Sequence, residues 1–139
     1  MINRWNKTVN PDDDVYIIGD FAYRSDNVLE ILDKLKGKKH LVIGNHDVKN
    51  LKNSEFRKRF VEIKDIITVN ENGIRIVLCH YPMIEWNGMY REAWHFFGHI
   101  HNNENNAQKI MRTIPKAVNV GADLIDFTPR TAKELMGGN

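Results

Sequence analysis

The stretch Gly44-Asn45-His46-Asp47 follows the apolar run His40–Ile43, and this pairing points to the fold of the chain. A second stretch, Gly98-His99-Ile100-His101, follows the apolar run Trp94–Phe97 in the same way. Short apolar runs that end in glycine and polar residues are typical of buried strands followed by loops. In layered α/β folds, ligand sites assemble beyond the carboxyl ends of such strands. The two stretches therefore predict an α/β fold whose polar loops share one rim.

Two further motifs follow strand-like runs. Gly19-Asp20 ends the run Val15–Ile18, and Cys79-His80-Tyr81-Pro82 ends the run Ile74–Cys79. Carboxylate and amide oxygens together with imidazole nitrogens form a mixed shell that suits Mn, Fe, Co, Ni or Zn better than calcium. We therefore expect a divalent metal site where these strands end. The side chains expected there are Asp20, Asn45, His80 and His99.

Helices are predicted where apolar residues recur at helical spacing and capping residues flank them. Ser25 is expected to cap one helix, which Gly37 would end. Thr128 is expected to cap the last helix, with Pro129 at its first position. The predicted helical segments are Met1–Val9, Val28–Leu35, Leu51–Phe60 and Pro129–Leu135.

A β-hairpin is predicted around Asn72-Gly73, because this dipeptide favours a tight turn between antiparallel strands. Its arms would be Ile63–Val69 and Ile74–Cys79. The segment Tyr81–Tyr90 is predicted to be a loop, and Ala117–Gly121 a last short strand.

Composition limits the class of protein. The chain has 139 residues, of which 42% are hydrophobic and 27% charged, so we expect one globular domain over residues 1–139. A net charge of +2 is too small to indicate a nucleic-acid or membrane partner. The single cysteine excludes an internal disulfide framework. Because no apolar stretch approaches the ~20 residues of a membrane span, we expect a cytoplasmic protein.

The order of the four motifs resembles the calcineurin-like metallophosphoesterase superfamily, especially its small bacterial and phage-type members. The resemblance runs from Val15 to about Asp126. It implies a four-layer α/β/β/α sandwich with divalent metal ions at one sheet edge. It also implies hydrolysis of a phosphodiester or phosphomonoester, either a small molecule or a nucleotide, by a metal-activated hydroxide. Mn²⁺ is the expected ion, with Fe, Zn, Ni and Co as alternatives.

The resemblance assigns metal ligands position by position. Asp20 would be the carboxylate that bridges two ions. Asn45, His80 and His99 would complete one metal site with it, and His101 would belong to the other site.

Other roles follow from the same resemblance and from chemistry. His46 would be the catalytic acid, and Asp47 could orient it. Arg24 could bind a phosphate oxygen or form an ordinary surface ion pair. Tyr81 could stack on a nucleoside or aryl group of the substrate, or simply pack its loop.

Three side chains are predicted to have no chemical role. His95 matches no ligand position and is expected to be structural. His40, at the start of a strand, is expected to be solvated, and Cys79 to be buried by packing.

The sequence departs from the family pattern at its start. The family opens with a strand that ends in Asp-x-His and supplies two ligands of the second site, and no such motif precedes Asp20. One site is therefore expected to be complete, while the second keeps only Asp20 and His101. The chain is then either a fragment or a natural short form, and the alternative function is a catalytically weak or silent metal-binding remnant. The lost strand would expose a sheet edge, through which a homo-oligomer could form.

Overall fold

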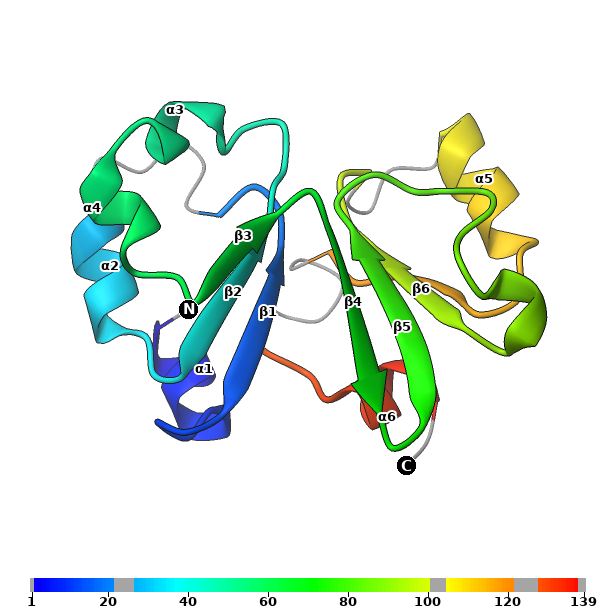
Figure 1. The fold of residues 1–139 in the computed structure, drawn as a ribbon, viewed down its shortest axis with the longest axis horizontal. Coiled ribbons are helices and arrows are strands. Elements are labelled where there is room, and N and C mark those ends of the chain that lie inside the picture. Colours follow the sequence, from blue (N-terminus) through cyan, green and yellow to red (C-terminus); the bar gives the residue numbers. More distant parts are fainter. Residues whose placement is uncertain (1, 22–26, 101–104, 122–127, 138–139) are drawn as a thin grey trace.

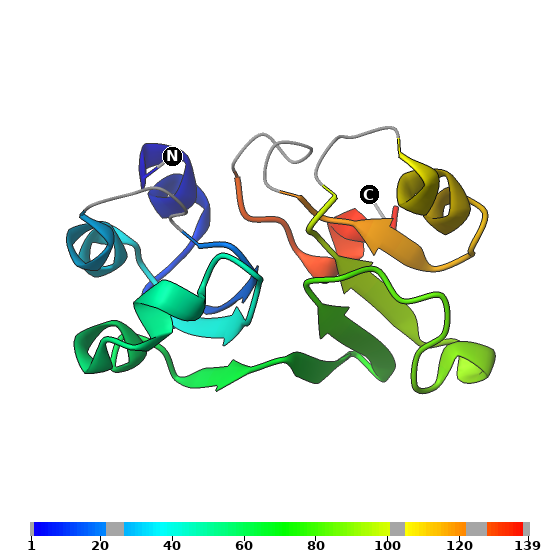
Figure 2. The same cartoon turned by 90° about the horizontal axis from the view of Figure 1, so that it is seen from above.

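The computed structural model of the chain describes residues 2–21, 27–100, 105–121 and 128–137. Its strands form two β-sheets, one of three strands and one of four. The two sheets face each other, and helices lie on their outer sides (Figure 1; Figure 2). Parallel and antiparallel pairs are both present, so the predicted α/β class is confirmed. The complete four-layer sandwich and the single domain remain predictions.

The first sheet is parallel and has the order β1-β2-β3. Strand β1 covers Asp14–Ile18, β2 covers Lys38–Val42 and β3 covers Glu62–Lys64. Four helices gather on its outer face, at the left of Figure 1. They are α1 (Ile2–Thr8), α2 (Val28–Lys34), α3 (Val48–Leu51) and α4 (Ser54–Arg57).

The second sheet has the order β4-β5-β6-β7, in which only the β4–β5 pair is antiparallel. Helix α5 lies on its outer side, and α6 lies near the start of β5 (Figure 1). The elements are β4 (Ile66–Glu71), β5 (Ile74–Cys79), the short 3₁₀ helix η1 (Met89–Arg91), β6 (Trp94–Phe97), α5 (Asn106–Arg112), β7 (Ala117–Asn119) and α6 (Ala132–Leu135).

A hydrophobic core joins the two sheets. Val42 of β2 packs in one cluster with Ile76 and Leu78 of β5 and Phe96 of β6. Leu78 is 3% exposed, and burying such a side chain contributes about 1.5–3 kcal/mol. This packing holds the strand ends of the two sheets at a fixed distance from each other.

The chain passes from one sheet to the other at Asp65. The segment Ile63–Val69 is predicted as one strand, but it forms β3 and β4, which belong to different sheets. Before Asp65 the chain pairs in parallel with β2, and after it the chain pairs antiparallel with β5. The prediction is therefore wrong about the continuity of this strand, whereas the β4–β5 hairpin is confirmed.

Two helix predictions need correction. The segment Leu51–Phe60 does not form one helix, because Asn53 is extended and its side chain accepts a hydrogen bond from Glu55 N at 2.9 Å, which starts a new helix. The last helix begins at Ala132 with Thr131 as its cap, so Thr128 is not the capping residue. Ser25 lies outside the described residues, and helix α5 is absent from the sequence-based prediction.

His40 is buried, which contradicts the prediction that it is solvated. It lies on the central strand β2, between β1 and β3. Its Nε2 lies 2.8 Å from Asp14 Oδ1 and its Nδ1 lies 2.6 Å from Glu62 Oε2. Its ring also stacks on Tyr16, with the ring centroids 4.3 Å apart. The neighbouring strands on both sides supply these partners. The burial of His40 could therefore be predicted only if the order of the strands in the sheet were known.

Cys79 is half-buried, whereas the sequence predicted a buried packing residue. Burial raises the pKa of its thiol, which favours the unreactive protonated form. No helix among the described residues is long and apolar enough to cross a membrane.

Candidate metal centre

The predicted metal ligands all follow strands that end at the same rim. Asp20 and Asn45 lie in the loops after β1 and β2, and His80 and His99 lie in the loops after β5 and β6. The strands of each pair are parallel, and all four have their carboxyl ends at the top of Figure 1. The described part of the structure thus brings these four residues together.

His80 Nε2 lies at the centre of the group. It is 3.0 Å from Asn45 Oδ1, 3.2 Å from Asp20 Oδ2 and 3.2 Å from His99 Nδ1. One ligand atom each from Asp20, His80 and His99 lies within 4.8 Å of the others. His80 is only 1% exposed, so its ring is held by the surrounding protein.

The tautomer of His80 follows from its second ring nitrogen. Nδ1 lies 3.1 Å from the carbonyl oxygen of Ile18, which can only accept a hydrogen bond. Nδ1 therefore carries the proton, and Nε2 presents a lone pair toward Asp20, Asn45 and His99. A backbone carbonyl that fixes a histidine in this way is the usual support of a metal ligand.

The donor set fits a divalent cation. Two ligand atoms at ~2.1 Å from one ion are about 3.0–3.4 Å apart when the angle at the ion is octahedral or tetrahedral. The three contacts of His80 Nε2, at 3.0, 3.2 and 3.2 Å, fall in this range. Several lone pairs that converge at such distances repel one another unless a cation or a proton lies between them. Asp20, Asn45, His80 and His99 could therefore hold a divalent ion.

Two of these residues have a strained backbone. Asp20 has φ of 57° and His99 has φ of 61°, in the left-handed region that non-glycine residues rarely adopt. Such a conformation costs about 1–3 kcal/mol and persists only where the surrounding structure imposes it. In this conformation the side chains of Asp20 and His99 both lie next to the His80 ring.

Asp47 ties the β1 and β2 loops together through the backbone. Its Oδ2 accepts hydrogen bonds from Gly44 N at 2.7 Å and Asp20 N at 2.9 Å, and its Oδ1 accepts from Phe21 N at 2.9 Å. Burial is the largest influence on its carboxyl group and raises the pKa, while the three N–H donors lower it. Asp47 thus supports two ligand loops, and its expected role of orienting His46 remains a prediction.

Glycine is required where these loops touch. A Cβ at Gly44 would lie 2.4 Å from Asp20 Oδ1, and a Cβ at Gly19 would lie 2.1 Å from His80 Nδ1. Real Cβ atoms do not approach other atoms so closely, so any side chain would push the ligands apart. The glycine of each motif is therefore a condition for the metal geometry.

The other predicted site residues are placed as follows. His46 is exposed beside Asn45, and its backbone N–H donates to Asp20 Oδ1 at 2.8 Å. Tyr81 is 45% exposed, and the centroid of its ring is 4.7 Å from that of His99. His101 and Arg24 lie outside the described residues.

His95 is structural, as expected. It is fully buried, its Nδ1–H donates to Val77 O at 2.9 Å, and its Nε2 accepts from Met83 N at 3.0 Å. Burial lowers its pKa, so the ring is neutral at pH 7. Its bond to Met83 anchors the loop that begins at His80.

Sequence reasoning missed two supports of the site. The Ile18 carbonyl that orients His80 is a backbone group, and backbone acceptors leave no trace in the sequence. The hydrogen bonds by which Asp47 joins the two loops had only an indirect indication in the sequence. That indication is Gly44, which lets its loop approach Asp20 closely.

Comparison with known proteins agrees with this geometry. A crystal structure of a protein of unknown function from Aquifex aeolicus is similar, with a TM-score of 0.71 and 25% sequence identity, over 96% of this chain and 80% of that one. No curated protein gives a significant match. The family model for calcineurin-like phosphoesterases matches residues 1–95, which include Asp20, Asn45 and His80 of the four candidate ligands. On these grounds the chain belongs to the calcineurin-like phosphoesterase family.

Proposed function

We propose that this protein hydrolyses small phosphoesters, either diesters or monoesters, with a divalent ion held by Asp20, Asn45, His80 and His99. Membership of the family indicates metal-dependent phosphoester hydrolysis in general. The observation that carries the proposal for this chain is the convergence of three ligand atoms on His80 Nε2 at 3.0–3.2 Å.

The charge of the donor set favours a phosphoester substrate. Asp20 is the only anionic ligand of the four, and the other three are neutral. With a divalent ion the group would therefore have a net charge of +1, which attracts an anionic ester. When bound, the ion acts as a Lewis acid on a phosphoryl oxygen and makes a water molecule more acidic. We propose Mn²⁺, because oxygen and nitrogen donors are mixed.

His46 would be the proton donor to the leaving oxygen. It is exposed next to Asn45, and its backbone N–H donates to Asp20 Oδ1 at 2.8 Å. Histidine is the side chain that most often serves as a general acid in enzymes. Because its neighbour Asn45 reaches the metal group, His46 is close to where an ester would react.

Tyr81 supports a substrate with a flat aromatic group, such as a nucleotide or an aryl ester. Its ring lies against His99 and His80, at centroid distances of 4.7 and 5.1 Å, and it stays 45% exposed. An exposed ring beside a reactive centre can stack on a base or aryl group. We also propose Arg24 as a phosphate contact and His101 as a ligand of a second ion, on the sequence pattern alone.

Hydrolysis of bis(4-nitrophenyl) phosphate with added Mn²⁺ tests the proposal. We expect chelation to abolish the activity and His80→Ala or Asn45→Ala to lower kcat/KM by about 100-fold or more, because each removes a ligand. Asn87→Ala is the matched control, since Asn87 is also an exposed asparagine but adjoins Gly88, which lies against Ala93 and Arg75. Activity that survives chelation, or that both ligand variants retain, would contradict the mechanism.

A metal-binding remnant with weak or no catalysis is the alternative. It is favoured by the fact that the described residues bring together the ligands of one ion only. Metal analysis of the purified protein separates the two functions. One ion per chain without turnover would support the remnant, and turnover that depends on His46 would support the enzyme.

A further inference from the structure

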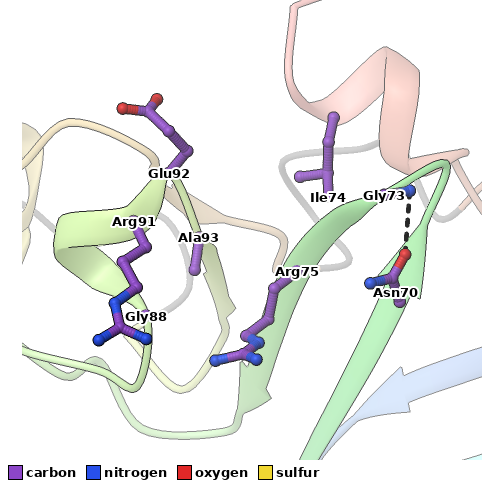
Figure 3. A pocket seen from close by; sticks show the side chains of 8 residues that line it. All are labelled: Asn70, Gly73, Ile74, Arg75, Gly88, Arg91, Glu92 and Ala93. Carbon is purple, nitrogen blue, oxygen red and sulfur yellow. Dashed lines mark hydrogen bonds between the residues drawn. The ribbon is translucent and has the colours of Figure 1, made fainter.

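A second polar site lies beside the start of β5, away from the metal centre. A pocket of about 220 Å³ is present there, between the β4–β5 turn and the loop that contains η1 (Figure 3). Pockets for drug-sized ligands are larger, about 300–1,000 Å³, so this one suits a small ligand. Its polar lining comes from Asn70, Gly73, Arg75, Arg91 and Glu92.

Arg75 is held in place on one side of the pocket. It lies on β5 opposite Asn70 of β4, which fixes where its side chain begins. Its guanidinium packs against Gly88, where a Cβ would lie 3.1 Å from Nη1. Gly88 also has φ of 85°, in the left-handed region that glycine adopts most easily. The loop thus leaves room for the guanidinium group.

Arg91 brings a second guanidinium group to the same space. It belongs to η1, and Figure 3 shows its side chain and that of Arg75 extending toward the same side of the pocket. Among the residues that the structure describes, neither guanidinium group has a hydrogen-bond or ion-pair partner, although the backbone N–H of Arg91 donates to Gly88 O. Two like charges in one small pocket repel each other, so a bound anion would stabilise them.

The rest of the lining does not supply that anion. The carboxylate of Glu92 is paired with Lys116 and points away from both guanidinium groups in Figure 3. Asn70 Oδ1 accepts a hydrogen bond from Gly73 N at 2.9 Å, which leaves the NH₂ group of Asn70 as a donor. The pocket therefore offers donors and positive charge.

We propose that this pocket binds the phosphoryl group of a small molecule, or inorganic phosphate itself, through Arg75 and Arg91. A guanidinium group matches two oxygens of a phosphate at once, and two such groups balance a dianion. Arg75 and His80 are five positions apart on an extended segment, which corresponds to about 17 Å at ~3.4 Å per residue. The pocket is therefore separate from the metal centre, and its occupant is a different anion from the ester that would react there.

Titration of inorganic phosphate into ¹⁵N-labelled, chelator-treated protein at constant salt tests this site. We expect saturable shifts of the backbone amide signals of Gly73, Gly88 and Glu92. Arg75→Gln and Arg91→Gln should each raise the Kd for phosphate about tenfold or more, because each removes a charge-assisted contact. The same titration with His80→Ala should give the wild-type Kd, since the metal centre is not involved.

The control is Arg57→Gln, an arginine whose Nη1 donates to Leu51 O on the other side of the molecule. It should leave the Kd unchanged. Thermal unfolding checks that each variant is folded. Because Arg75 and Arg91 are exposed, we expect both variants to fold, and either one alone suffices for the test. Shifts that do not saturate, an unchanged Kd in both pocket variants, or shifts confined to the amides around His80 would overturn the proposal.

Acetate and succinate form the second arm of the test. Phosphate that binds at least tenfold more tightly than either carboxylate would support a phosphoryl ligand. Carboxylates that bind equally or more tightly would overturn that assignment, because the pocket would then recognise a carboxylate.

Discussion

Asp47 Oδ2 accepts a hydrogen bond from the backbone N–H of Asp20 at 2.9 Å, and this contact joins two loops that are far apart in the sequence. The same oxygen accepts from Gly44 N at 2.7 Å. Because Asp20 and Asn45 are both proposed ligands, one buried carboxylate fixes the two loops that present them. The arrangement of the proposed ligands thus depends on a side chain that is not itself a ligand.

Asp47→Asn should weaken both the fold and the metal site. Both oxygens of Asp47 accept hydrogen bonds, so an amide NH₂ in place of either oxygen would face an N–H donor. A buried donor without an acceptor costs about 1–3 kcal/mol, and we expect this loss in chemical unfolding. Calorimetric titration should show Mn²⁺ affinity lowered by about 10–100-fold, the usual effect of losing a supporting contact.

Asp33→Asn is the matched control for that variant. Asp33 is an exposed aspartate whose contact is the side chain of Arg59, and exposed ion pairs contribute about 0–1 kcal/mol. Its Mn²⁺ affinity should equal that of the wild type. If Asp47→Asn also bound Mn²⁺ with the affinity of the wild type, the hydrogen bonds of Asp47 would not be what positions the ligands.

Gly44→Ala should disrupt the same junction by steric means. The added Cβ would lie 2.4 Å from Asp20 Oδ1 and 2.5 Å from Asp20 N, so the two loops must separate. Overpacking of this kind costs about 1–3 kcal/mol. Gly73→Ala is a useful comparison, because a Cβ there meets nothing within 4 Å, although its φ of 83° makes alanine unfavourable. Only Gly44→Ala should reduce metal binding, as measured by calorimetry.

The motifs at the strand ends could be predicted from the sequence because each apolar run ends in a local turn. The runs before Asp20, Asn45, His80 and His99 all form strands, and the four side chains meet at one rim. Strand direction made this possible, since parallel strands bring their carboxyl ends to the same edge. The roles of these residues as ligands remain predictions until metal binding is measured.

Features that depend on partners distant in the sequence were not predicted. The burial of His40 comes from Asp14 and Glu62 on the neighbouring strands, and nothing near His40 in the sequence reveals them. The break at Asp65 depends on a change of partner strand, while the apolar pattern of Ile63–Val69 continues through it. Periodicity reports the local backbone and not the strand to which it pairs.

Metal binding should stabilise the fold through the proposed ligands. An ion present at about 100 times its Kd adds about 2.7 kcal/mol to the free energy of unfolding, if it binds only the folded state. We expect Mn²⁺ to raise the Tm of the wild type but not of His80→Ala. His40→Ala is the control, because His40 is a buried histidine outside the metal group. Its Tm should begin lower and still rise with Mn²⁺, and a response in His80→Ala would argue against the ligand assignment.

The neutral ring of His95 should make the fold sensitive to acid. Burial lowers the pKa of His95 in the folded state, while the unfolded chain has the ordinary value of about 6.5. As the pH falls below that value, the unfolded state takes up a proton that the folded state does not, so the free energy of unfolding decreases. For one proton the slope reaches about 1.4 kcal/mol per pH unit. His95→Gln removes the group, so its unfolding free energy, measured in urea between pH 7 and pH 5, should be lower at pH 7 but fall less steeply. Parallel curves for the two proteins would mean that His95 is protonated equally in the folded and unfolded states.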